Sequence, residues 1–356
     1  MIQYILRRLL TLPLILFFVT GIIFLMILQV PAEERVMAYL PSVRPNLSEQ
    51  EFAHLLEVTI ERYGLDRPPT VQYVDWISSL ARGDWGYSPT WRQPVLEGLL
   101  QRAPATIELT LFATIPAFLL AILLGALSVR RQGSLPDHLI RAGTFLGWSF
   151  PPFILALILM NVFYAWLGWF PPERMSYWAS DLLRSESFHS ITGLLSVDAL
   201  LNGNLPLFWD ALRHLVLPGF ILALTEWGLL ARIMRSSLLE VMSMDYITTA
   251  RSKGLSEHAV VSRHAVRNAV LPVISTGSVI GASLITTVTV IEMVFNYNGI
   301  GRWAIMSFLS YEIPVTVGFA IFSCIVTLLS SLVADILYAL VDPRIRLLVV
   351  NRSLAE

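Results

Sequence analysis

The sequence predicts an all-α integral membrane protein with six transmembrane helices and a small helical extracytoplasmic segment between the first and second spans. Two observations indicate this class. Hydrophobic residues occupy 55% of the chain and charged residues only 14%, whereas about a quarter of the residues in an ordinary soluble domain are charged. Apolar stretches of about 20 residues, the length that a membrane-spanning helix needs, also recur along the chain.

Six stretches are long and apolar enough to cross a bilayer. The first is preceded by Arg7 and Arg8, as the apolar part of a signal peptide would be. Its apolar run is too long for that, and no small-residue cleavage site follows, so we expect an uncleaved span. Prolines inside several stretches are expected to kink the helices. The predicted spans are residues 9–30 (within an N-terminal unit 1–30), 105–128, 142–168, 215–234, 270–291 and 315–341.

The distribution of arginine and lysine predicts the orientation of the chain. These residues are more frequent in the connections on the side of the N-terminus than in the short connections on the opposite side, and the connection 235–269 is rich in them. By the positive-inside rule, we expect the N-terminus and the C-terminal tail 342–356 in the cytoplasm. The segments 31–104 and 169–214 are then extracytoplasmic.

The outer segment 31–104 carries local signals for helices. Ser48 and Glu51 have the spacing of a capping box, which predicts a helix to about residue 62, and Gly64 is suited to end it. Thr70 is a candidate cap for a second helix that ends near residue 82. We therefore expect a small folded cap of amphipathic helices. The segment 169–214 is polar, and the sequence assigns no structure to it.

Several kinds of chemistry are excluded by what the sequence lacks. Lys253 has no upstream glycine pattern, so there is no phosphate-binding loop and we expect no ATP hydrolysis by this chain. No GxSxG or HExxH motif is present. Cys324 is the single cysteine, which excludes an internal disulfide. The net charge of −1 gives no indication of nucleic-acid binding. We expect a chain that is not an enzyme and binds no metal or cofactor of its own.

The cytoplasmic connection 235–269 has the most informative pattern. Asp245, or Ser243 as an alternative cap, begins a short helix that Gly254 ends in a left-handed conformation. Ser256 then begins a second helix that runs into the fifth span. We expect a helix–glycine–helix elbow whose apolar side chains, Ile247 among them, enter a groove of a partner. The alternative is a loop that only anchors topology. The candidate coupling residues are Asp245, Tyr246, Ala250, Arg251, Gly254 and Leu255.

Fragments in order along the chain resemble one family. The text DYITTARSKGL followed by RHAVRNAVLP at 263–272 is similar to the coupling loop of permease subunits of binding-protein-dependent ABC importers, in the dipeptide and oligopeptide branch. Two positions depart from the family pattern, Thr248-Thr249-Ala250 at the start of the motif and Asn298-Gly299 in an outer turn. Further similar fragments are ILRRL at 5–9, RYGLDRP at 62–68, GDWGYS at 83–88, TIELT at 106–110, RSSLLEVM at 235–242, EMVFNYNGIGRW at 292–303 and VDPRIR at 341–346.

The resemblance implies a type I ABC importer permease fold, with residues 105–341 as the transmembrane core, in a bacterial inner membrane. It implies three kinds of protein partner: a homologous second permease subunit, two ATP-binding subunits that bind ATP and Mg²⁺, and an extracytoplasmic solute-binding protein. It also implies that the fifth span lines the path between two subunits and that the solute is a peptide or is similar to one. The chain would form half of that path.

Polar and small residues inside the spans are candidates for this path. A charge inside a membrane is costly and is usually directed toward protein or water. Small residues also allow close helix packing, so packing is the alternative for each of them. The path candidates are Glu108, Glu226, Ser275, Thr276, Gly277, Ser278, Gly281 and Ser283.

Two other functions stay open from the residues alone. One is a proton-coupled secondary transporter in which Glu108, Glu226 and Asp335 carry protons, although no inverted repeat is visible in the sequence. The other is a membrane-embedded enzyme, although the sequence has no nucleophile–base pair or metal-ligand set.

Overall fold

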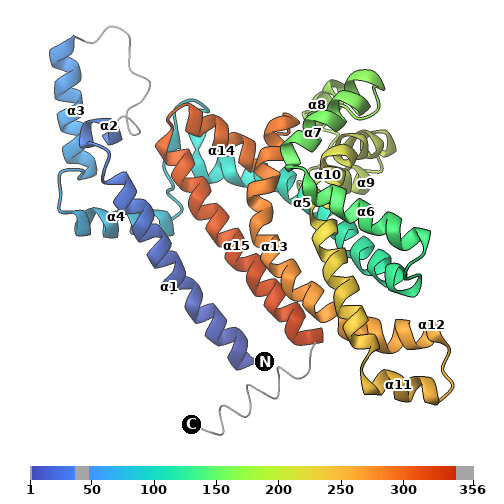
Figure 1. Ribbon diagram of the computed structural model, residues 1–356. Helices are drawn as coiled ribbons and strands as arrows, with labels where there is room; N and C mark the ends of the chain where they lie inside the picture. Colours follow the sequence, from blue (N-terminus) through green and yellow to red (C-terminus); the bar gives the residue numbers. More distant parts are fainter. Residues whose placement is uncertain (1, 37–47, 342–356) are drawn as a thin grey trace, which may run out of the picture.

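The computed structural model describes residues 2–36 and 48–341, and of 2–9, 49, 278–279, 281–284, 334–335 and 337–341 only the backbone. This part of the chain is helical apart from one short antiparallel strand pair, β1 (Tyr87–Ser88) and β2 (Gln93–Pro94). The long helices run in one general direction and form the body of the molecule (Figure 1).

The N-terminal part consists of α1 (Ile2–Ile27), α2 (Ala32–Arg35), α3 (Glu49–Tyr63) and α4 (Pro69–Ala81). The predicted capping box of Ser48 and Glu51 is confirmed, and Gly64 ends α3 at φ 63°. The prediction that Thr70 caps the next helix is wrong: α4 begins one residue earlier at Pro69, since proline at the first helical position loses no hydrogen bond. Tyr73 of α4 contacts Thr20 of α1 (3.0 Å), which ties α4 to the end of the first span.

Helix α5 (Val95–Arg130) begins directly after the strand pair and extends beyond the predicted span 105–128 at both ends.

The predicted span 142–168 is divided between α6 (Leu135–Ser149) and α7 (Pro152–Met160), and α7 continues as a π-helical segment (Asn161–Trp166). The two parts meet at 103°. Pro152 has no N–H for the helix ladder, and a residue that precedes proline avoids the helical conformation; Phe150, before Pro151, is accordingly extended.

The segment 169–214, to which the sequence assigned no structure, is folded. It holds α8 (Tyr177–Leu183), α9 (Leu195–Leu201) and the beginning of α10 (Leu205–Met242). A small core of its own supports it: Ala179, Leu195, Ala199, Leu207 and Ala211. Burial alone would raise the pKa of Asp198, but hydrogen bonds from Thr192, Gly193 and Ser190 lower it. These bonds fix the loop between α8 and α9.

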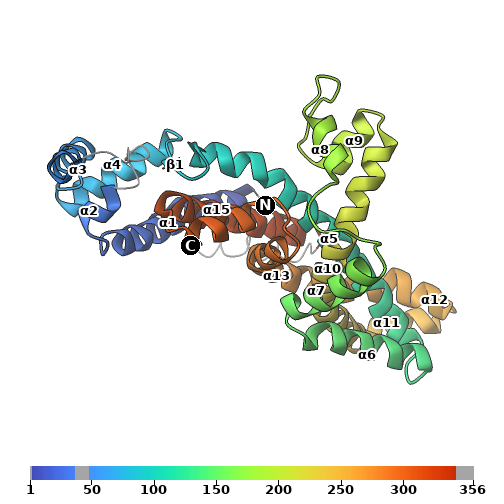
Figure 2. The same ribbon diagram turned by 90° about the horizontal axis from the view of Figure 1, so that it is seen from above.

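The rest of the described chain contains α11 (Asp245–Ser252), α12 (Glu257–Ala259) with a π-helical continuation (Val260–Ala265), α13 (Val266–Val294), α14 (Ile300–Leu309) and α15 (Ile313–Val341). Helices α5, α10 and α13 pack together at the centre. Helix α1 lies beside α15, with α3 and α4 at its end, and α6 and α7 lie at the opposite side of the molecule (Figure 2).

Length and composition identify the helices able to cross a membrane. Within the described residues, four qualify, in α1, α5, α10 and α15, and the bent pair α6–α7 makes five if it counts as one span. Helix α13 contributes a shorter apolar segment, Ile285–Val294. The chain is therefore a multi-pass, mainly helical membrane protein.

Candidate functional site

The elbow between α10 and α13 packs firmly on the rest of the chain. On α11, the side chains of Ile247 (0% exposed) and Ala250 (7%) are directed into the protein. There they join a buried cluster with residues of α5, α10, the π-helical segment after α12 and α13: Ala121, Leu238, Val241, Val260, Val261, Ala265, Ala269 and Val273 among them. The expectation that Ile247 and Ala250 enter a partner's groove is wrong, because the chain's own core takes up this face of the short helix.

The opposite face of the elbow is exposed. Tyr246 is 39% exposed and Leu255 is 41% exposed. Gly254 has φ +78°, the left-handed conformation that the sequence predicts, and Ser256 caps the next helix by accepting from the N–H of Ala259. Asp245 stands in the first turn of α11, with Met244 as the capping residue instead of Ser243. The elbow thus has an anchored inner face and a free outer face.

Polar contacts connect the elbow to the spans on either side. Arg251 pairs with Glu257 across the Gly254 turn (2.7 Å). The Tyr246 hydroxyl accepts a hydrogen bond from Asn268 of α13 (2.8 Å), and His258 of α12 contacts Arg130 at the end of α5. These contacts tie α11 to α13 and α12 to α5.

Arg251→Ala is expected to change the stability of the chain by less than about 1 kcal/mol, because both members of the pair with Glu257 are largely exposed. Thermal unfolding of the purified chain checks this. The double variant Arg251→Glu/Glu257→Arg is the control, since it restores the internal pair with its charges exchanged. A melting temperature of the double variant equal to that of wild type, with a lower one for Arg251→Ala, would assign the effect to the internal pair.

The candidate path residues of α13 are not equivalent. A side chain at Gly277 would overlap Phe118 of α5, so this glycine permits close packing of two helices of the same chain. Ser275 is exposed and Thr276 is partly exposed, which leaves them available for a path. Ser278, Gly281 and Ser283 lie in α13, but their side chains are outside the described part of the structure. The same holds for Asp335 in α15.

Glu108 is an anchor for the outer segment. Its carboxylate is buried and pairs with Arg174 (2.9 Å). It also accepts hydrogen bonds from the N–H groups of Leu195 and Ser196 and from the Ser196 hydroxyl. A carboxylate that accepts the first N–H groups of α9 stabilises the beginning of that helix. These contacts support the packing alternative for Glu108.

Glu108→Gln is expected to lower the free energy of unfolding by about 2 kcal/mol, since the amide keeps part of the hydrogen bonding but leaves Arg174 without its counter-charge. Thermal unfolding and limited proteolysis of 169–204 in the detergent-purified chain measure the effect. Glu97→Gln, at an exposed position of the same helix, is the control and should behave as wild type. Lost transport with unchanged stability would instead assign Glu108 to the path.

Glu226 differs from Glu108. It is 4% exposed in the middle of α10, beside Thr114 of α5. No cationic side chain pairs with it in the described part of the chain. A buried carboxylate without a counter-charge is costly to retain in a span, and it stays a candidate path residue.

The sequence analysis did not single out four buried carboxylates, Asp137, Asp198, Glu292 and Glu312. Glu292, at the end of α13, accepts from the Thr106 hydroxyl (2.5 Å) and from the N–H of Arg302 (3.0 Å), which caps α14. Glu312 accepts from the Ser88 hydroxyl (2.6 Å) and the N–H of Thr90 (2.9 Å), which fixes the strand pair. Glu292 and Arg302 both lie within the fragment EMVFNYNGIGRW, but Thr106 comes from the distant helix α5. Among the described residues, no group of three or more His, Cys, Asp and Glu side chains could hold a metal ion.

Comparisons with known proteins agree along nearly the whole chain. Residues 109–347 match the model of the family described as binding-protein-dependent transport system inner membrane component, and residues 1–110 match the model of the N-terminal part of such membrane components. The chain is 35% identical to the di/tripeptide transport system permease protein DppB of Pseudomonas aeruginosa over 347 residues, 97% of this chain and 99% of that protein. It is 35% identical, with the same coverage, to the oligopeptide transport system permease protein AppB of Bacillus subtilis. It is 33% identical to the dipeptide transport system permease protein DppB of Escherichia coli K12 over 97% of this chain and 99% of that protein.

Proposed function

The chain belongs to the family of inner-membrane components of binding-protein-dependent transport systems, and we propose that it forms half of a translocation path for peptides or peptide-like solutes. It is a permease subunit of an ABC importer. The relatives named above are permeases for dipeptides, tripeptides or oligopeptides, and this supports the solute class.

The elbow carries the proposal for coupling. Its inner face, Ile247 and Ala250, is fixed in the core of α10 and α13. Its outer face exposes Tyr246 and Leu255 on either side of the Gly254 turn. A short helix that is rigidly attached to two spans and open on the other side can transmit the movement of a docked subunit to the spans. The energy then comes from two ATP-binding partner subunits, which bind ATP and Mg²⁺.

We also propose that the chain has six spans and that both termini are cytoplasmic, because the arrangement of the helices agrees with both. The six are α1, α5, the bent pair α6–α7, α10, α13 and α15. The beginning of α1, the end of α15 and α11 lie at one end of the molecule, while α8 and α9 lie at the other (Figure 1). Exposed aromatic side chains in the second region are typical of a membrane–water interface: Trp166, Trp169, Tyr177, Trp178 and Trp209. The segment 31–104 would then lie outside, where a solute-binding protein docks.

Purification and reconstitution test this function. In mild detergent, we expect the chain to copurify with a homologous permease and two ATPase subunits. In proteoliposomes, uptake of a labelled peptide should need both ATP and the solute-binding protein. Uptake driven by a proton gradient without ATP would contradict the proposal in favour of a secondary transporter. Turnover by the purified chain alone would favour an enzyme.

A further inference from the structure

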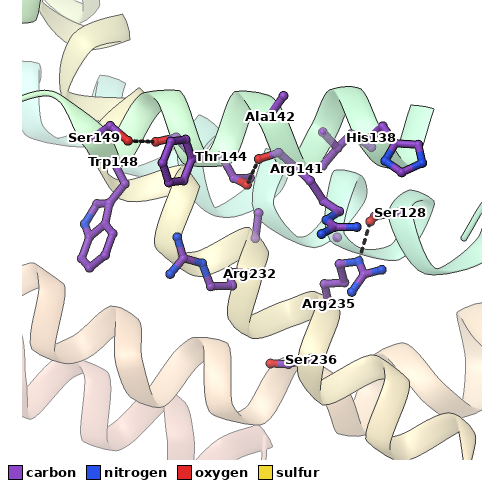
Figure 3. A pocket seen from close by; sticks show the side chains of 14 residues that line it. Ser128, His138, Arg141, Ala142, Thr144, Trp148, Ser149, Arg232, Arg235 and Ser236 are labelled. Carbon is purple, nitrogen blue, oxygen red and sulfur yellow. Dashed lines mark hydrogen bonds between the residues drawn. The ribbon is translucent and has the colours of Figure 1, made fainter. Parts of the chain in front are cut away.

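A basic pocket of about 800 Å³ lies between α5, α6 and α10, close to the end of α5 (Figure 3). Arg141 and His138 of α6 line it from one side. Arg232 and Arg235 of α10 line it from the other side: Arg141 and Arg235 are directed toward one another, and Arg232 lies beside Trp148 (Figure 3). No acidic side chain is among the described residues that line it.

Only one of these cations is neutralised. The Nε of Arg235 donates to the Ser128 hydroxyl (2.9 Å) and lies 3.3 Å from a carboxylate oxygen of buried Asp137. The guanidinium of Arg232 stacks on the ring of Trp148 at 5.2 Å, a contact that leaves its charge in place. The guanidinium of Arg141 has no hydrogen bond or ion pair within the described part of the chain. The pocket therefore holds uncompensated positive charge.

The wall beside these arginines is apolar and exposed. Phe145 is 66% exposed and Trp148 is 55% exposed, both on the face of α6 that carries Arg141. Leu139 and Leu146 are also exposed, but they lie near the opposite face of α6 and outside the pocket. Arginines with exposed aromatic side chains next to them match the two parts of a phospholipid, its phosphate and its acyl chains.

We propose that this pocket binds the phosphate group of an anionic phospholipid of the cytoplasmic leaflet, with the acyl chains along Phe145 and Trp148. The level of the pocket agrees with this, because Ser128, which lines it, lies two residues before the end of α5 at Arg130. The inference rests on the membrane orientation proposed above. A phosphate held by Arg141 and Arg232 joins α6 to α10, the helix that leads directly into the elbow.

Lipid retention by the purified complete transporter tests the site. The complex is incubated with phosphatidylglycerol, or with phosphatidylcholine as the neutral comparison, and the retained lipid is counted by native mass spectrometry. The double variant Arg141→Gln/Arg232→Gln should retain phosphatidylglycerol about tenfold less well. Arg131→Gln is the matched control, since Arg131 is an exposed residue at the end of α5 outside the pocket, and it should retain the lipid as wild type does.

Other results would overturn the inference. These are equal retention by the double variant and wild type, displacement of the lipid by millimolar inorganic phosphate, and attachment of a photoreactive residue at position 145 to a protein subunit instead of a lipid. The same spectra report the subunits present. A complex without ATPase subunits contradicts the proposed function, whereas an intact complex that does not retain phosphatidylglycerol contradicts only the lipid site.

Discussion

Gly299→Ala is expected to destabilise the chain by about 3 kcal/mol or more and to prevent its recovery as a folded membrane protein. The added Cβ would overlap the carboxylate of Glu292. That carboxylate cannot move away freely, because the Thr106 hydroxyl and the N–H of Arg302 both bind it. The backbone is not the cause: Gly299 has φ −101° and ψ −177°, an extended conformation that alanine adopts readily.

Extraction yield and thermal unfolding in detergent measure this effect. Gly21→Ala is the matched control, because a Cβ at Gly21 in α1 meets no atom within 4 Å, and it should be neutral or slightly stabilising. Glu292→Ala/Gly299→Ala should be no less stable than Glu292→Ala alone, since the overlap is absent once the carboxylate is removed. A Gly299→Ala chain with the yield and melting temperature of wild type would contradict this account of the α14 cap.

Gly254→Val is expected to leave the chain inserted in the membrane but to abolish uptake and the retention of ATPase subunits. A Cβ at Gly254 meets no atom within 4 Å, so the whole cost arises from the left-handed backbone at φ +78°. That conformation costs an ordinary residue about 1–2 kcal/mol, and a β-branched residue more. The turn would relax, and Tyr246 and Leu255 would lose their relative positions on the outer face. Gly254→Asn should be milder, because asparagine tolerates this conformation best after glycine.

Copurified ATPase and ATP-driven uptake in proteoliposomes are the measurements. Gly133→Val is a control of the same backbone strain, with φ +74° and open space around its Cβ, in the turn between α5 and α6. It should lose a similar amount of stability and keep its ATPase subunits. If Gly254→Val transports normally with its ATPases attached, the connection 235–269 is only a topology anchor.

The sequence by itself determined the membrane class, the approximate positions of the long helices, the capping box at Ser48, the left-handed Gly254 and the helix that begins at Ser256. These features depend on residues close together in the chain, because hydropathy, caps and glycine conformations are local.

The tertiary structure alone decided the rest. A short amphipathic helix has one apolar face, and the sequence cannot tell whether a partner or its own chain covers it; in α11 the core of α10 and α13 covers Ile247 and Ala250. The sequence likewise did not determine the structural roles of Glu108 and Glu292. The donors to Glu108 lie 66 or more residues away in the chain, and the Thr106 hydroxyl that donates to Glu292 lies 186 residues away. Such pairs form only when the helices pack, so no local pattern specifies them.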